Sequence, residues 1–152
     1  MRKTILGLSL ILLSIFTLDA QTLTMNKVPP AVSHAFRAKY AAAQQESWEL
    51  VASNTYQVGF FNAKKRQTAR FDNTGKWLET ETDVTNGQIP RPVSNAIPKN
   101  FPGFDIQIMS QIEAADGTIT YEVVLFKGRE NYDVVFSVKG EILKKEAGQP
   151  NE

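Results

Sequence analysis

The chain contains no cysteine. This absence excludes disulfide bonds, thiolate metal sites and a lipid anchor on an N-terminal cysteine. Stability must therefore come from the burial of apolar side chains. The composition allows this, because hydrophobic residues make up 42% of the chain and charged residues 22%, which is ordinary for a globular protein.

Histidine is almost absent, since His34 is the only one. On a helix it would lie about 200° from Val32, on the polar side, where an exposed histidine without a catalytic role is expected. A zinc site or a nucleophilic triad would need further histidine or cysteine residues. Glu79, Glu81 and Asp83 alternate along one strand, which is typical of a solvated strand face. We therefore predict no cofactor, no metal site and no enzymatic activity.

Neither sign of charge is in excess once the N-terminal segment is set aside. Without Arg2, Lys3 and Asp19 the chain keeps 17 − 2 = 15 basic and 16 − 1 = 15 acidic residues. Binding to phosphate backbones depends on clustered lysine and arginine. We therefore predict that nucleic acid is not a partner.

The longest apolar run is too short to span a membrane. It covers residues 4–18, roughly 15 residues where a bilayer needs about 20. Arg2 and Lys3 precede it, and Asp19 with Ala20 provides the polar break and small residue of a signal peptidase site. We predict a signal peptide at 1–20 and a mature protein that is periplasmic or secreted, with no membrane attachment.

Two parts of the chain repeat each other. Residues 28–36 align with 89–97 at an offset of 89 − 28 = 61, and residues 55–61 align with 120–126 at 121 − 56 = 65. The difference implies about four extra residues in the second copy, where Asp116-Gly117 is a hairpin signal. Agreement in residue type, order and spacing predicts a duplicated unit.

Each copy begins with a helix, for which Pro30 and Pro92 are suited to the first turn. Period-two alternation then indicates half-buried antiparallel strands. We expect strands near 46–52, 55–61, 66–71 and 76–83, and near 105–113, 118–126, 131–138 and 141–146.

The predicted fold is α+β, with both copies in one sheet of about eight strands and both helices on one face. The first repeat covers 28–84 and the second 89–146. Segments 21–27 and 147–152 are expected to be flexible ends.

The same alternation predicts which side chains face away from the helices. With Leu78 and Leu143 pointing inward, the other face carries apolar side chains beside charges such as Glu122 and Asp133. Apolar patches on a solvated face often mark interaction sites, although strand twist, a loop or a different register could bury them. The predicted binding residues are Phe61, Arg70, Trp77, Val124, Phe126, Val135 and Ile142.

The repeated motifs resemble those of the PepSY-like family of exported Gram-negative proteins. Each copy has Val/Ile-Pro-x-x-Val, then Tyr-x-Val, Phe-x-x-x-Gly and Leu-x-x-Glu, over roughly residues 28–146. The second copy fits best through Phe101-Pro102-Gly103, whereas the first lacks Pro-Gly after Tyr40. The resemblance implies a fold similar to that of the β-lactamase inhibitor protein and a non-enzymatic periplasmic domain. Some related PepSY domains are thought to restrain proteases, and no functional residue carries over.

These observations favour a periplasmic binding or inhibitor-like module that docks an unknown protein or peptide on the helix-free face of the sheet. The alternative is a carrier of a small ligand or ion in the cleft between the two repeats. An enzyme would require a catalytic role for the acidic strand 79–83.

The exported protein should begin at Gln21, because Ala20 is the small residue that signal peptidase needs before the cleaved bond. Intact-mass measurement of the protein released from producing cells tests this. A chain that keeps residues 1–20 and stays in the membrane fraction would contradict it.

Overall fold

The structure is a computed structural model that describes residues 21–148. The predicted signal peptide and residues 149–152 of the predicted flexible C-terminus lie outside the described residues. None of the helices within 21–148 is long and apolar enough to cross a membrane.

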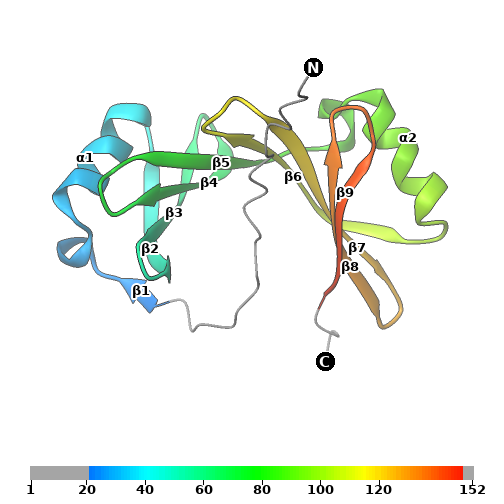
Figure 1. Cartoon of the computed structure of the whole chain (residues 1–152), viewed down its shortest axis with the longest axis horizontal. Helices are drawn as coiled ribbons and strands as arrows, with labels where there is room; N and C mark the ends of the chain where they lie inside the picture. Colours follow the sequence, from blue (N-terminus) through cyan, green and yellow to red (C-terminus); the bar gives the residue numbers. More distant parts are fainter. Residues whose placement is uncertain (1–20, 149–152) are drawn as a thin grey trace, which may run out of the picture.

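The described chain contains helices and strands in the order that Figure 1 shows. The helices are α1 (Pro30–Lys39) and α2 (Arg91–Asn100), with short 3-10 turns η1 (Met25–Lys27) and η2 (Asn86–Gln88). The strands are β1 (Gln21–Leu23), β2 (Gln44–Ala52), β3 (Thr55–Asn62), β4 (Lys65–Asp72), β5 (Trp77–Asp83), β6 (Asp105–Ala114), β7 (Ile119–Lys127), β8 (Glu130–Ser137) and β9 (Ile142–Ala147).

All of these strands join one antiparallel sheet, each paired with the next in the chain. The α+β class and the antiparallel pairing are confirmed. Within residues 21–148 the sheet has nine strands rather than about eight, because β1 pairs with the free edge of β2.

The expectation of a flexible segment at 21–27 is wrong, since it forms β1 and η1. Leu23 pairs with Trp48 and packs against the first core. The unpaired backbone groups of β2 offer this segment hydrogen bonds that the sequence pattern does not reveal.

The first half of the chain has a core built around one aromatic side chain of α1. Phe36 is fully buried, and its ring centroid lies 5.0 Å from that of Phe60, 5.2 Å from Trp48 and 6.3 Å from Phe71. Such edge-to-face contacts stabilise aromatic pairs beyond the area they bury. The helix is thereby held against β2, β3 and β4.

The second half has its own core beneath α2. Val93 and Ile97 of the helix pack with Val123 and Leu125 of β7 and with Phe136 of β8. In Figure 1, α1 lies on the outer side of the first half and α2 on the outer side of the second, with the strands between them. Each half therefore buries its apolar side chains under its own helix.

A glycine in the turn before the last strand of each half lies against the first turn of the helix. A Cβ on Gly75 would overlap the carbonyl of Ala31, and one on Gly140 would overlap the carbonyl of Pro92. Both residues have positive φ, at +86° and +79°, a conformation that favours glycine. These turns thus require glycine for both space and backbone angle.

Gly140→Ala should destabilise the protein at least about twice as much as Gly117→Ala. Both glycines have positive φ, which costs an L-residue roughly 1–2 kcal/mol, but the space around Gly117 is open whereas Gly140 meets backbone. Urea unfolding of the two variants beside the unsubstituted protein measures the difference. Equal losses of unfolding free energy in the two variants would show that α2 and the turn at Gly140 are not in close contact.

Candidate binding surface on the sheet

The strand residues that alternate with the core residues form a second face, which we call the opposite face. The pairing aligns Gln57, Arg70 and Glu79 across β3, β4 and β5. It likewise aligns Ser110, Glu122 and Val135 across β6, β7 and β8. Since residues directly across a ladder point to the same side, these two sets belong to the opposite face.

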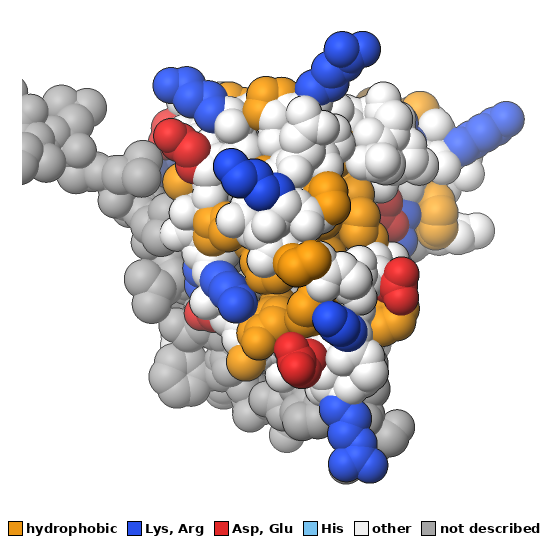
Figure 2. Space-filling model, turned by 90° about the vertical axis from the view of Figure 1, so that its right-hand side faces the viewer, with side chains coloured by type: hydrophobic (Ala, Val, Ile, Leu, Met, Phe, Trp, Pro, Cys, Tyr) orange, Lys and Arg blue, Asp and Glu red, His pale blue; other side chains and the backbone are white. Residues whose placement is uncertain are grey.

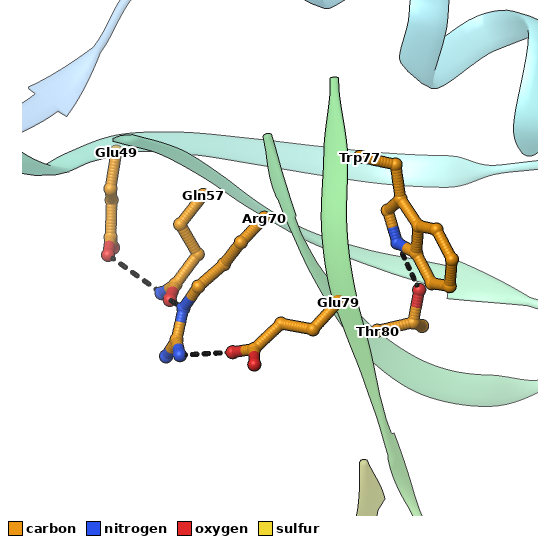
Figure 3. A network of polar contacts seen from close by, with 6 residues as sticks. All are labelled: Glu49, Gln57, Arg70, Trp77, Glu79 and Thr80. Atoms are coloured by element: carbon orange, nitrogen blue, oxygen red, sulfur yellow. Dashed lines mark hydrogen bonds and ion pairs between the residues drawn. The ribbon is translucent and has the colours of Figure 1, made fainter. Parts of the chain in front are cut away.

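A hydrogen-bonded network ties the first half of this face together (Figure 3). Arg70 donates from Nε to Oε1 of Gln57 at 2.8 Å, and its Nη1 lies 2.5 Å from Oε1 of Glu79. Gln57 donates in turn to Glu49 at 3.4 Å. The side chains of Arg70 and Glu79 are each 19% exposed, so the guanidinium is held between strands rather than extended into solvent.

The second half of the opposite face collects acidic groups around Glu122. Burial raises the pKa of Glu122 to about 7, and the nearby carboxylates of Glu81 and Asp133 act in the same direction. Burial also raises the pKa of Asp133, with Glu146 adding to the effect. This part of the face therefore holds carboxyl groups whose ionisation is opposed by their surroundings.

Ser110 lies between two acidic residues in the ladder, across from Asp83 on β5 and from Glu122 on β7. The residue is 1% exposed, and its hydroxyl has no hydrogen-bond partner among residues 21–148. A buried polar group without a partner costs stability. The row Asp83–Ser110–Glu122 is thus energetically unfavourable in the protein by itself.

Several of the predicted binding residues lie on the opposite face. Phe61 is 42% exposed at the end of β3, and Arg70 belongs to the network described above. Val124, Phe126 and Val135 are partly buried on β7 and β8, in register with other residues of this face. The structure thus places Val124, Phe126 and Val135 together on neighbouring strands, and Phe61 apart from them on β3.

Trp77 is not on this face, which corrects the prediction. It packs against the first core, and its indole N–H donates to Oγ1 of Thr80 at 2.9 Å. The ammonium nitrogen of Lys39 lies 3.7 Å from the centroid of the Trp77 ring. Figure 3 shows the indole on the other side of the strands from the Arg70 network. Its place in the core removes it as a candidate anchor.

The cause is a β-bulge that the sequence pattern does not show. Arg70 pairs with Glu79 but Phe71 pairs with Trp77, so Leu78 is an extra residue in β5. An extra residue reverses the alternation beyond it.

The same shift recurs at β9. Val135 pairs with Lys144 and Phe136 pairs with Ile142, so Leu143 is the extra residue. Ile142 therefore lies in register with a core residue and not on the opposite face. The prediction that Leu78 and Leu143 point inward is wrong for the same reason.

Glu122, Ser110 and Asp83 were not among the predicted binding residues. Alternation alone assigns Glu122 and Asp133 to this face, but the shift of their pKa values depends on burial by neighbouring strands. A polar residue within the apolar run of β6 was the available signal for Ser110.

Another exposed apolar area lies at the end of the molecule that carries α2 (Figure 2). The ring centroids of Phe104, near α2 in the chain, and of Tyr132 on β8 lie 5.5 Å apart, and the ammonium of Lys145 lies 4.0 Å from the Tyr132 ring centroid. Lys127 lies 5.6 Å from the Phe104 ring. The protein's own lysines therefore already contact these aromatic rings.

A family model described as beta-lactamase-inhibitor-like, PepSY-like matches residues 54–144. This match confirms the resemblance drawn from the repeated motifs. No curated protein matches the chain.

Solved structures from Bacteroides share the fold. A chain from Bacteroides eggerthii DSM 20697, described as periplasmic, is 21% identical with a TM-score of 0.74, covering 79% of this chain and 88% of that one. A DUF2874 family protein from Bacteroides uniformis ATCC 8492 is 21% identical with a TM-score of 0.72, covering 78% and 88%. A BLIP-like protein from Bacteroides fragilis NCTC 9343 is 20% identical with a TM-score of 0.68, covering 80% and 87%. The description of the first agrees with the predicted periplasmic or secreted localisation.

Glu122→Gln should remove a pH dependence of stability. The folded-state pKa of about 7 exceeds the ordinary 4.5, so the folded protein binds more protons between these values and wild-type stability falls as pH rises from about 4.5 to 7. The expected fall is on the order of 2–3 kcal/mol, since a tenfold change in proton affinity equals about 1.4 kcal/mol.

Urea unfolding at pH 5 and pH 8 measures this effect. At pH 8 the free energy of unfolding of the variant should exceed that of the wild type. A smaller pH dependence of stability should remain in the variant because of Asp133, whose pKa is also raised. If the free energy of unfolding changes equally in the variant and the wild type between the two pH values, Glu122 ionises with an ordinary pKa in the folded protein.

Proposed function

Because the chain belongs to the PepSY-like, beta-lactamase-inhibitor-like family, we propose that it is a non-enzymatic periplasmic binding or inhibitor-like module. It docks a protein or peptide on the opposite face of its sheet. The observation that carries the proposal is that this face combines exposed apolar side chains with charges, while α1 and α2 pack against the two cores.

We further infer that the chain is a tandem repeat with both helices on one face. The glycines at 75 and 140 meet their helices at aligned positions, and the bulges in β5 and β9 are aligned. The ladder runs unbroken from Ala69 of the first core through Thr80 and Glu113 to Ile119, which packs on the second core. Residues in one ladder share a side of the sheet, which supports a single helix-bearing face.

The apolar part of the opposite face gathers side chains from β6 and β7. Ile108 is 48% exposed and pairs with Val124, and Phe126 follows two residues later on the same strand. Aromatic and aliphatic groups surrounded by polar side chains are typical of protein interfaces. Phe61 and Phe126 are the aromatic candidates for anchors, since such side chains dominate binding energy at interfaces.

The arrangement of potential catalytic groups supports a binding role rather than an enzyme. His34 is exposed on α1, so it lies on a helix and not among the carboxylates of the opposite face. Those carboxylates have neither an imidazole base nor a nucleophile paired with one, which acid–base and nucleophilic catalysis usually require.

Photo-crosslinking tests the location of the interface. The crosslinking amino acid p-benzoylphenylalanine replaces Phe126 or Ile108 on the opposite face, and Val138 serves as the control because it is 44% exposed in the β8–β9 turn. In producing cells, positions 108 and 126 should trap the same protein and position 138 should not. Trapping that is as strong from 138, or absent from both face positions, would overturn the proposal.

A further inference from the structure

Resting on the proposed function, we propose that the opposite face recognises a lysine or arginine side chain of its partner. The receiving site is the row Asp83–Ser110–Glu122 across β5, β6 and β7.

Within the described chain, the oxygen of Ser110 lacks the hydrogen-bond donor that a cation would bring. Directly opposed residues in an antiparallel pair have Cβ atoms about 4.5–5.5 Å apart, so Ser110 is an immediate neighbour of both carboxylates. Its oxygen has no hydrogen-bond partner among residues 21–148 and the residue is 1% exposed. An ammonium supplies three N–H donors and a guanidinium five, and both lack acceptors.

The charged groups around Glu122 leave a local excess of negative charge. Glu81 on β5 and Asp133 on β8 oppose its ionisation, whereas Arg70 on β4 and Lys144 on β9 favour it. Each of these two cations also pairs with another carboxylate, Arg70 with Glu79 at 2.5 Å and Lys144 with Glu146 at 3.0 Å. A positive group from outside would therefore complement the row.

The surroundings fit a side chain better than a metal ion. Within residues 21–148 no group of three or more Asp, Glu and His side chains is placed to hold a metal ion. Ile108 and Val124 adjoin the row on the same face, and Val135 pairs with Glu122. Lysine and arginine bury their aliphatic stems against such groups while the charged end stays near polar ones.

Binding of this kind depends on pH with a defined sign. Burial and like charges raise the pKa of Glu122 to about 7, and a bound cation favours the ionised form. A proton therefore leaves Glu122 when the cation binds, and affinity falls as pH drops below about 7. Asp133, whose pKa is also raised, acts in the same direction.

The probe is tetralysine, added at low salt to the mature ¹⁵N-labelled protein, with tetraglutamate as the matched anionic control. Low salt is needed because screening weakens exposed charge contacts. Tetralysine should shift amide signals of β5, β6, β7 and β8 around the row, and its affinity should rise about tenfold from pH 5.5 to pH 8. Tetraglutamate should shift none of them.

Glu122→Gln should abolish most of the pH dependence and weaken tetralysine binding several-fold. Glu130→Gln is the control, since it removes the same charge from an exposed position at the start of β8, and it should behave as the wild type. Asp83→Asn is a second variant, in case Glu122→Gln alters the fold, and it should lose part of the affinity for tetralysine.

Unchanged binding in Glu122→Gln and Asp83→Asn, or signal shifts outside the row, would overturn this inference. That failure is distinct from failure of the proposed function, because crosslinking from positions 108 and 126 can still trap a partner. Crosslinking only from position 138, by contrast, would overturn the proposed function whatever tetralysine does.

Discussion

The structure depends on unbroken strand pairing from β1 to β9, because this pairing decides on which side of the sheet every side chain lies. The joint between the halves is the ladder of β5 with β6, where Thr80 pairs with Glu113. A unit of about 60 residues buries too little surface to be comfortably stable by itself. The shared ladder makes one sheet of the two, and it aligns their surfaces so that charged and apolar groups from both halves meet on the opposite face.

The two sides of the sheet have different energetic roles. On the core side of each half, fully buried residues such as Phe36 and Phe136 stabilise the fold. On the opposite face, the ionisation of half-buried Glu122 costs stability, as does the Ser110 hydroxyl, which has no hydrogen-bond partner within the described chain. Perturbed groups of this kind concentrate at functional sites. The unfavourable row therefore supports the proposal of a partner that supplies a positive charge and hydrogen-bond donors.

Much of the fold could be predicted from local pattern. Period-two alternation identified antiparallel strands, and Pro30 and Pro92 lie in the first turns of α1 and α2. Short-range signals succeed here because alternation and the fixed φ of proline act within a few residues. β1 was missed, since three residues show no pattern and form a strand only because β2 has an edge to pair with. Trp77 was misplaced, since one extra residue in β5 reversed a strand that otherwise looked regular.

The amino-acid sequence by itself determined the α+β class, the starting points of the helices and the family, because these follow from residue spacing along the chain. Only the tertiary structure decided that Trp77 belongs to a core and that Glu122 lies beside Ser110 with its pKa raised. The physical reason is that a bulge, a ladder partner and the burial of a carboxyl group all depend on neighbouring strands. Those neighbours lie nearby in space but not always along the chain, so local pattern cannot contain them.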